Sequence, residues 1–411
     1  MLGGGRCHAP PLPDKTPPPQ PFPASGGGSF GRGLNVRLLG RLLLVLLSLV
    51  ALLLLALKLR YGGGSTDFPD RSGTPSLPAS ALEVVAELPT PPGNIAVSAQ
   101  GRVFVSLHPE ARPSQTLVEL VDGQMRPWPS AAAQARFTDV LGIRIDGQQR
   151  LWTLDNGGHG LKAVKLTAFD LATGAVLREI VFPRALAGLG SHYNDLQVSA
   201  DGGTVYIADA SFFGLRPALV VVDVASGQAR RLLEGHPSVV AEKYIPVVQG
   251  RRMEAFGLVA IRPGVDSIAL SRDDQWLYYA PISNSHLYRI RTADLRNPAL
   301  EAEQLAGQVE TLAPKTMSDG LSSDDQGRIY LSDLEHSAVV RYTPETGALE
   351  TLIKTEALRW PDGFSFGPDG WLYVTGSALQ QVIGLPAASV AAHAPYPVFR
   401  FQPGASAAAG H

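Results

Sequence analysis

The chain has 411 residues, of which 45% are hydrophobic and only 18% are charged, and its formal net charge is −2. This length suits one large domain or two ordinary ones. The near-neutral charge, without blocks of like-charged residues, lacks the basic surface with which proteins hold nucleic acid, so we expect no nucleic-acid partner. The single cysteine, Cys7, excludes an intramolecular disulfide and a cysteine-based metal site.

The first 60 residues differ in composition from the rest of the chain. Residues 1–36 are rich in Pro, Gly and Ser and predict a disordered leader. Residues 37–60 contain "RLLLVLLSLVALLLLALKLR" and predict a transmembrane helix, whose basic residues Arg41 and Lys58 can reach the membrane interfaces. We expect an uncleaved signal anchor, with the remainder of the chain in the periplasm or outside the cell. The alternative is a protein secreted after signal cleavage.

One phrase recurs six times after a polar linker at residues 61–80. Each copy has an alternating apolar run, a turn rich in Asp and Gly, and a second apolar run that contains an aromatic residue in most copies, as in "MSDGLSSDDQGRIYLSD" and "WPDGFSFGPDGWLYVTG". This pattern is typical of a β-hairpin. The copies begin at Gly93, Asp139, Asn194, Asp266, Asp319 and Asp362.

A second phrase, as in "LTAFDLATGAVLREI", follows several copies and adds two more strands to the unit. Six four-stranded units predict an all-β, six-bladed β-propeller over residues 81–390, with a C-terminal tail at 391–411. The sixth unit ends at "QQVIGLP" without a fourth strand, so we expect the strand at 81–88 to complete it and close the ring. The long interval between the third and fourth copies predicts an extra loop or hairpin over one face.

Several long stretches resemble the Yellow / major royal jelly protein family, in particular its bacterial members. They include "LWTLDNG", "NDLQVSADGGTVYIADAS", "IALSRDDQWLYYAPISNSHLYRI" and "SDGLSSDDQGRIYLSDLEHSAVVRY", and the resemblance covers about residues 84–385. It implies a six-bladed propeller that is more distantly similar to regucalcin and gluconolactonase. It also implies dopachrome-tautomerase-like or lactonase activity, or the binding of small amines, although the cysteines of the insect members are missing.

The repeated phrase places oxygen-bearing side chains at one position, just before the innermost strand of five blades. There they would face the central channel and form a ligand-binding site at its mouth. Carboxylate and amide oxygens suit Ca²⁺ or Mg²⁺, and a spare carboxylate could act as a general base. The alternative is that each residue only caps a turn through backbone hydrogen bonds. The candidates are Asp139, Asn194, Asp266, Asp319 and Asp362.

Two of these residues are the candidates for a metal site. Asn194 and Asp319 resemble the metal-binding Asn and Asp of gluconolactonase-type propellers. The glutamate that those enzymes supply from the first blade has no counterpart, because Gly93 stands there.

Three other residues invite a catalytic interpretation. His159 and His192 are expected in loops near the channel, where each is either a base or a solvated loop residue. Ser365 lies in "GFSFG", which matches the serine-hydrolase pattern G-x-S-x-G. That nucleophile requires a turn between a strand and a helix, whereas Ser365 is predicted inside a strand.

The sequence thus leaves two functional hypotheses. In the first, the protein is an enzyme acting on a small cyclic molecule, by dopachrome-tautomerase-like isomerisation or by metal-assisted lactone hydrolysis. In the second, it is a non-catalytic ligand-binding or scaffold protein at the cell surface. Catalysis requires a poised acid or base, whereas binding requires only a shaped pocket.

Overall fold

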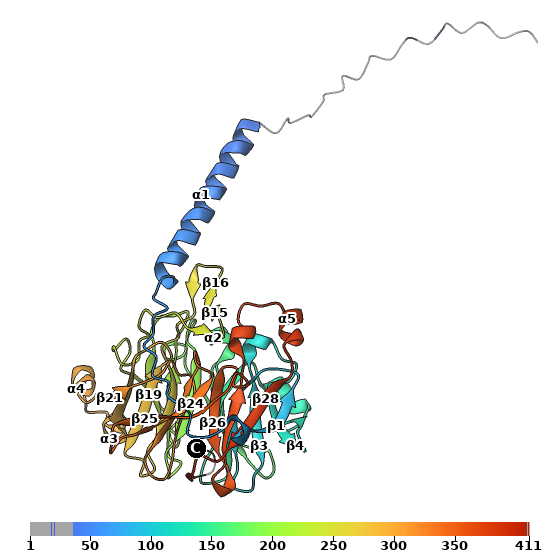
Figure 1. The fold of residues 1–411 in the computed structure, drawn as a ribbon. Coiled ribbons are helices and arrows are strands. Elements are labelled where there is room, and N and C mark those ends of the chain that lie inside the picture. Colours follow the sequence, from blue (N-terminus) through green and yellow to red (C-terminus); the bar gives the residue numbers. More distant parts are fainter. Residues whose placement is uncertain (1–17, 19, 21–35, 409, 411) are drawn as a thin grey trace, which may run out of the picture. The chain divides into compact units, whose positions relative to one another are not determined.

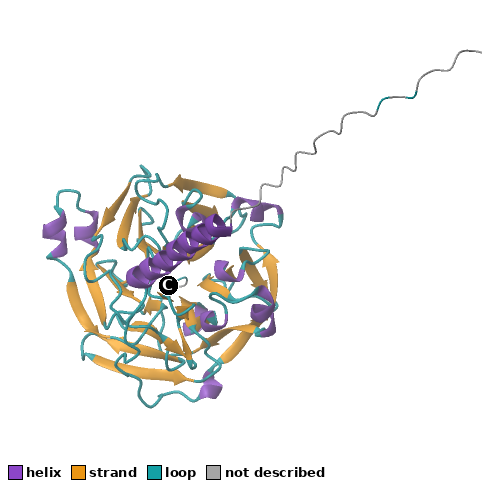
Figure 2. Ribbon diagram, turned by 90° about the horizontal axis from the view of Figure 1, so that it is seen from above, coloured by secondary structure: helices purple, strands orange, loops and turns teal. Residues whose placement is uncertain are grey.

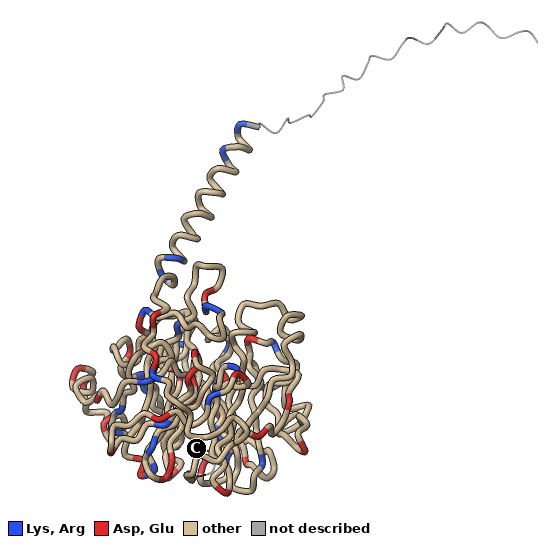
Figure 3. The backbone as a smooth tube through the Cα atoms, viewed as in Figure 1, with Lys and Arg blue, Asp and Glu red and all other residues tan. Residues whose placement is uncertain are grey.

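The computed structural model describes residues 18, 20, 36–408 and 410. The N-terminal helix α1 covers Val36–Tyr61. At about 1.5 Å per residue it is long enough, and from Arg37 onward apolar enough, to cross a membrane. Figure 3 shows that α1 carries basic residues only near its two ends. This result agrees with the predicted transmembrane helix.

Residues beyond the helix form a six-bladed β-propeller, which confirms the predicted fold class (Figure 2). Each blade is a four-stranded antiparallel sheet whose strands follow one another from the innermost to the outermost. The first three blades are β2 (Pro92–Val97), β3 (Val103–Leu107), β4 (Leu117–Val121), β5 (Gln124–Pro127); β6 (Val140–Ile145), β7 (Arg150–Asp155), β8 (Lys165–Asp170), β9 (Val176–Val181); and β10 (Tyr193–Val198), β11 (Thr204–Asp209), β12 (Ala218–Asp223), β13 (Ala229–Leu232). The last three are β18 (Val265–Leu270), β19 (Trp276–Pro281), β20 (His286–Arg291), β21 (Glu310–Pro314); β22 (Leu321–Ser323), β23 (Ile329–Asp333), β24 (Ala338–Thr343), β25 (Ala348–Lys354); and β26 (Pro361–Phe366), β27 (Leu372–Gly376), β28 (Tyr396–Phe401), β1 (Glu83–Leu88).

The ring is closed by strands from both ends of the propeller sequence. The innermost strands contact one another in the cyclic order β2, β6, β10, β18, β22 and β26, and β26 returns to β2. As expected, β1 is the outermost strand of the sixth blade, where it pairs with β28.

The third strand of that blade, β28, lies within the segment expected to be a C-terminal tail. Its sequence "YPVFRF" is separated from β27 by a loop at 377–395 that includes "QQVIGLP" and the short helix α5 (Ala387–Ala392). The loop breaks the hairpin spacing on which the sequence analysis depended, and so the strand was missed.

The Asp and Gly residues inside the repeated phrase make the hairpin turns. Oδ1 of Asp324 accepts hydrogen bonds from the backbone N–H groups of Gln326 (2.9 Å) and Arg328 (3.0 Å), and Gly327 takes the positive φ of 75°. Asp146 does the same in the second blade. These turns lie at the end of the innermost strand, away from the candidate site residues, which lie at or just before its start.

Neighbouring blades pack through interleaved apolar side chains. Trp152 and Leu154 of β7, for example, lie in one buried cluster with Leu196 and Val198 of β10. Burial of each such side chain stabilises the fold by about 1.5–3 kcal/mol. This packing fixes the innermost strands, and therefore the candidate site residues at their start.

We call the face of the propeller at which the innermost strands begin the pocket face. It carries the loops from the second to the third strand of each blade and the loops that connect successive blades. Two short hairpins, β14–β15 (Val247–Val248 and Arg251–Arg252) and β16–β17 (Glu254–Ala255 and Val259–Ala260), form the predicted insertion. Figure 1 shows β15 and β16 on the same face as α2 (Gly157–Gly160) and α5. Two further helices, α3 (Thr292–Arg296) and α4 (Ala302–Ala306), interrupt the fourth blade.

Candidate functional site

A cavity of about 370 Å³ lies on the pocket face, where the channel begins. Its wall is mostly apolar and comes from loops of several blades, including the inserted hairpins. Its polar groups come from residues at the start of the innermost strands and from three histidine-bearing loops. This combination, an apolar wall with a few converging polar groups, is typical of small-molecule sites. Prominent in the wall are Leu141, Phe212, Phe213, Val259, Ile261, Ile282, Trp360, Leu379 and Ile383.

Four of the five predicted channel residues line this cavity: Asn194, Asp266, Asp319 and Asp362. The three carboxyl groups come from consecutive blades, and their side-chain partners differ. Asp266 and Asp319 are buried, and Asp362 is partly buried. Oδ2 of Asp319 accepts a hydrogen bond of 2.7 Å from the indole Nε1 of Trp360, and Oδ2 of Asp362 accepts one of 2.6 Å from the Ser377 hydroxyl. Oδ1 of Asp266 is buried and has no hydrogen-bond partner among the described residues.

Burial and mutual repulsion keep these carboxyl groups from ionising readily. Burial raises the pKa of Asp319 to about 6, although the Trp360 hydrogen bond opposes this shift. The pKa values of Asp266 and Asp362 are also raised well above the usual range, first by burial and then by the negative charge of Asp319. The cavity therefore holds carboxyl groups that can carry protons near neutral pH.

A second layer of polar residues lies deeper in the channel and was not predicted. The buried Asp195 accepts a hydrogen bond of 3.0 Å from Nδ2 of Asn94, and its Oδ1 lies 3.7 Å from Nη2 of Arg144. Nη1 of Arg144 donates in turn to the backbone carbonyl of Gly410 (2.9 Å). The Asn-Asp pair at the start of β10 thus places one residue in the cavity and the next in this layer, a division that hairpin matching alone could not reveal.

Among the described residues, few positively charged side chains lie near the carboxyl groups. Arg144 is paired with Asp195, and its own pKa is lowered by burial. The buried Nζ of Lys315 donates to the backbone carbonyls of Ile282 (3.0 Å) and Thr316 (2.9 Å), and burial lowers its pKa to about 7. The region around Asp319 is therefore poor in positive charge, which favours occupation by a proton, a metal cation or a cationic ligand.

Three histidines and a glutamate form the opposite polar part of the cavity wall. The rings of His159 and His192 meet edge to face with centroids 4.5 Å apart, and Nε2 of His159 lies 3.9 Å from Oε1 of Glu110. Burial lowers the pKa of His192 to about 3 and that of His108 to about 4, so both are neutral at pH 7. Both ring nitrogens of His192 are buried without a hydrogen-bond partner in the described structure. The sequence analysis placed His159 and His192 near the channel but gave no signal for His108 or Glu110.

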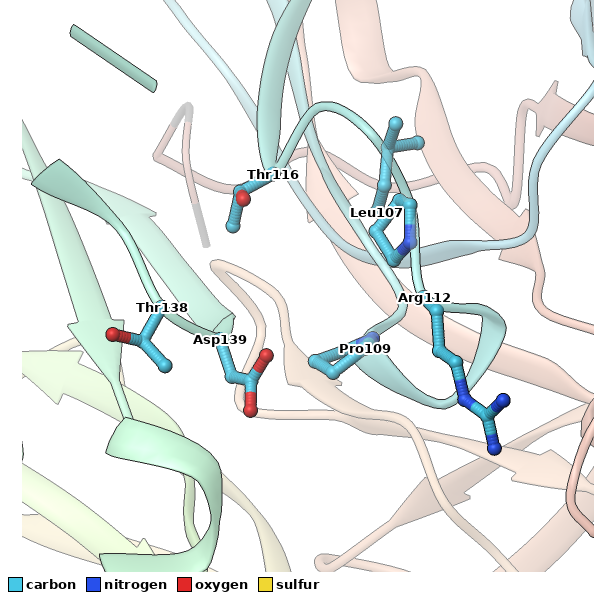
Figure 4. Close-up of a pocket in the computed structure, with 7 residues that line it drawn as sticks. Leu107, Pro109, Arg112, Thr116, Thr138 and Asp139 are labelled. Carbon is cyan, nitrogen blue, oxygen red and sulfur yellow. The ribbon is translucent and has the colours of Figure 1, made fainter. Parts of the chain in front are cut away.

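Asp139 lies outside this cavity, contrary to its predicted place in the channel site. It lines a separate cavity of about 320 Å³ near Arg112, Thr116 and Thr138 (Figure 4). Leu141 occupies the position in the second blade that corresponds to Asn194, inside the bulge of the innermost strand, and it does line the channel cavity. Asp139 lies two positions before Leu141, so matching the repeated phrases by sequence placed it two residues out of register.

The turn-capping role that the sequence analysis left open belongs to other aspartates. They stand at the end of the second strand in three blades. Oδ1 of Asp155 accepts from the N–H groups of Asp139 and Gly157 (both 3.0 Å), and Asp209 accepts likewise from His192 (2.7 Å) and Ser211 (3.0 Å). Asp333 accepts from the backbone of the next loop in the fifth blade. Turn capping therefore does not account for Asp266, Asp319 and Asp362.

Ser365 is excluded as a hydrolase nucleophile, as expected. It is fully buried in β26, and its hydroxyl accepts a hydrogen bond of 3.0 Å from the backbone N–H of Val97 in the neighbouring blade. No strand-to-helix turn surrounds it.

The residues at the cavity floor meet only some of the requirements of a metal-binding site. Asn194, Asp266, Asp319 and Asp362 supply the hard oxygen donors that Ca²⁺ and Mg²⁺ prefer, and Oδ1 of Asp266 is free to bind. Within residues 36–408, however, no three His, Cys, Asp or Glu side chains are arranged as a ready metal-binding group. The donor chemistry suits a divalent cation, and binding one would require these side chains to move closer together.

These features define a six-bladed β-propeller with a ligand-sized pocket at one end of its channel. Residues 138–363, more than half of the chain, match the family model described as Major royal jelly protein. The chain therefore belongs to the major royal jelly protein family, as the sequence resemblance predicted. A comparison with curated protein sequences gave no match.

Solved structures with the same fold include three distant relatives. A luciferin-regenerating enzyme is 12% identical (TM-score 0.52), and the match covers 80% of this chain and 97% of that one. A gluconolactonase from Xanthomonas campestris is 17% identical (TM-score 0.51; 82% and 96% covered). The calcium-binding protein regucalcin from Agrobacterium tumefaciens is 17% identical (TM-score 0.50; 80% and 95% covered). At these identities the likeness establishes the fold alone.

Proposed function

We propose that the channel cavity binds a small cyclic organic molecule and that the carboxyl groups beside it transfer protons during its isomerisation. The observation that carries this proposal is the set of three buried or partly buried carboxyl groups with raised pKa values in a mostly apolar cavity of about 370 Å³. The apolar wall would hold a ring compound and exclude water, and the carboxyl groups would act on its polar substituents.

Isomerisation of a quinone-like compound such as dopachrome requires a proton to leave one atom and return to another. A base and an acid must therefore face the same ligand. Asp319, with a pKa of about 6, is largely ionised at pH 7 and can accept a proton. Asp266 and Asp362 are held more firmly in the protonated form and can donate one. The neutral His192 would supply a further hydrogen-bonding group on the opposite wall.

Metal-assisted lactone hydrolysis is the second candidate, and the partnerless oxygen of Asp266 favours it. Ca²⁺ or Mg²⁺ would be held by Asn194 and Asp319 together with that oxygen, and the ion would polarise the lactone carbonyl. The charge of the cation would lower the pKa of Asp362, which could then serve as the base. Regucalcin and gluconolactonase, which share the fold, make this chemistry worth testing. A non-catalytic protein that binds its ligand in the same cavity is the alternative to both.

The decisive experiment compares the full-length protein with Asp319→Asn on dopachrome and on glucono-δ-lactone. Loss of a general acid or base typically lowers the rate by about 10²–10⁴-fold. We expect this loss for dopachrome without added metal. If turnover appears only for the lactone and only with Ca²⁺ or Mg²⁺, the second candidate is correct. Saturable binding without turnover of either compound would instead indicate the non-catalytic alternative.

A thermal unfolding titration with CaCl₂ and MgCl₂ tests the cation separately. A bound ion stabilises the folded state in proportion to the logarithm of its concentration above Kd. We expect the gain to disappear in an Asn194→Ala/Asp319→Ala double variant. If neither ion stabilises the wild type, the metal site is wrong and the proton-transfer proposal stands without it.

We also propose that α1 anchors the protein in a membrane, with the propeller in the periplasm or outside the cell. The length and apolar character of α1 support this localisation. Membrane fractionation of the full chain and of a truncation beginning at Tyr61 tests it. Release of the full-length protein as a soluble species would contradict the anchor and favour secretion after signal cleavage.

A further inference from the structure

Exposed apolar side chains of the propeller are concentrated on the pocket face. Outside α1 and this face, the exposed large apolar residues are Val84 on β1 and Val176, Leu177 and Val181 on β9, all on outer strands. Among the described residues, the turns of the opposite face carry none, and several of them are polar, such as "ADGG" and "RDDQ". The exposed apolar residues of the pocket face lie in four different loops between strands. They are Leu161, Leu189, Phe213, Leu215, Val240 and Phe256.

The hairpin β16–β17 presents the most exposed of these side chains. Phe256 is 91% exposed at its tip, in the uncharged segment "AFGLVAI". Its backbone has a φ of 52°, a left-handed conformation that a bulky aromatic residue rarely adopts. Packing within the propeller does not compensate for this conformation, since the ring is almost wholly exposed. Phe256 is therefore placed to contact something outside the chain.

The chain connects α1 to the same face through a very short segment. Only Gly62, Gly63 and Gly64 separate Tyr61, the last residue of α1, from Ser65. The backbone N–H of Ser65 donates to the carbonyl of Lys243 (2.9 Å), and Ile245 donates back to Ser65 (2.8 Å). Four residue steps span at most about 14 Å, so the end of α1 cannot lie farther than this from the inserted segment of the pocket face.

We propose that the pocket face docks on the lipid bilayer that holds α1, with Phe256 and its hairpin inserted into the interfacial region. The occupant is a lipid surface rather than another protein because the tether keeps this face near the membrane whenever α1 is embedded. The exposed Lys243 on the same face complements anionic headgroups, whereas the exposed Arg216 and Arg252 are paired with Glu234 and Glu254. This inference rests on the membrane anchoring proposed above and on no assumption about catalysis.

Docking also has a consequence for the ligand of the cavity. This consequence rests on the proposed function as well as on docking. Phe213, Phe256, Val259 and Ile261 belong both to the exposed loops or hairpin and to the cavity wall. With these side chains at the bilayer surface, the cavity opens toward the interface. Its ligands then include amphipathic ring compounds that partition into lipid, which enter without crossing bulk water.

The test uses the full-length chain in vesicles of phosphatidylcholine and phosphatidylglycerol. Cys7→Ser removes the only cysteine, and Phe256→Cys or Phe213→Cys then carries an environment-sensitive fluorophore. Leu177→Cys is the matched control, because Leu177 is 55% exposed on the outer strand β9. We expect lipids with a nitroxide near the headgroup to quench positions 256 and 213 at least several-fold more than position 177. Aqueous iodide, by contrast, should quench position 177 more strongly than positions 256 and 213.

Equal quenching by iodide at positions 256 and 177 would overturn the proposal. The proposal would also be overturned if the quenching by lipid fell when the protein was diluted among more vesicles. Dependence on protein density would indicate that a second copy of the chain, and not the lipid, covers the face. Labelling at two independent loops guards against a local disturbance of the hairpin. Since no substrate enters the measurement, failure of the proposed reaction leaves this result unaffected, and the reverse also holds.

Discussion

The indole Nε1 of Trp360 donates a hydrogen bond of 2.7 Å to Oδ2 of Asp319 across the junction between the fifth and sixth blades. Trp360 is buried and also forms part of the cavity wall. One residue therefore both shapes the cavity and sets the ionisation of its central carboxyl group. Hydrogen bonds to a charged group are worth about 1.5–3 kcal/mol, which corresponds to about one to two pKa units.

Trp360→Phe should consequently raise the pKa of Asp319 above its value of about 6. Phenylalanine keeps most of the aromatic volume but has no N–H group to stabilise the carboxylate. Infrared difference titration of the protonated carboxyl band measures the shift directly. Trp371→Phe is the matched control, since Trp371 lies beneath Arg400 (4.2 Å) outside the cavity. An unchanged titration in Trp360→Phe would show that the hydrogen bond does not control Asp319.

Asp266→Asn should stabilise the fold at alkaline pH. The folded-state pKa of Asp266 is raised above its unfolded value, so its ionisation in the folded state opposes folding increasingly as the pH rises. Asparagine is nearly isosteric and cannot ionise. We expect a gain in the free energy of unfolding at pH 8 that shrinks as the pH falls to 5.

Thermal and urea unfolding in detergent with a chelator present measure this gain. The control Glu87→Gln removes a carboxylate that is exposed on the outer strand β1 and should leave stability nearly unchanged. Destabilisation by Asp266→Asn at pH 8 would mean that the carboxylate has a partner that the structure does not show. Such a partner would be sought first among divalent cations.

The sequence specified the propeller more completely than the site. The closed ring can be predicted from six hairpins with regular turns and from a strand at 81–88 that fits the last blade. These features recur in the sequence because each blade buries the same alternating pattern of apolar residues. The strand β28 was missed because its partner in the hairpin lies beyond the loop at 377–395. Asp139 was misplaced because a bulge near the start of β6 sets the register, and a bulge leaves no mark in an apolar run.

The deeper polar layer escaped prediction for a different reason. Arg144 stands inside the strand β6, at a position where neighbouring blades carry buried residues, and only the closed ring brings it beside Asp195. Such contacts depend on the radius of the channel and on side chains from different blades. A single sequence contains the residues but not these distances.

Arg144 and Asp195 should show strong energetic coupling. Removal of one member of a buried ion pair leaves an uncompensated charge and costs about 3–5 kcal/mol, whereas removal of both often costs less. We expect Arg144→Gln to lower the free energy of unfolding by that amount and Asp195→Asn to restore at least half of it in the double variant. Urea unfolding of the four proteins completes the cycle. Simple additivity would show that the pair, at 3.7 Å, contributes only through its separate hydrogen bonds.

His192 should make the fold sensitive to acid. Its pKa is lowered to about 3 by burial, whereas the unfolded chain binds the proton near pH 6.5. Stability from this residue is therefore complete above pH 6.5 and declines as the pH falls toward 3, by about 3 kcal/mol at pH 4. His192→Leu removes the titrating group and both of its partnerless nitrogens, and should reduce the loss of stability between pH 6.5 and 4.

His286→Leu, in the strand β20, is the control and should retain the wild-type dependence of stability on pH. If the two variants decline equally with pH, another group controls acid unfolding, and the neutral state assigned to His192 in the cavity loses its support.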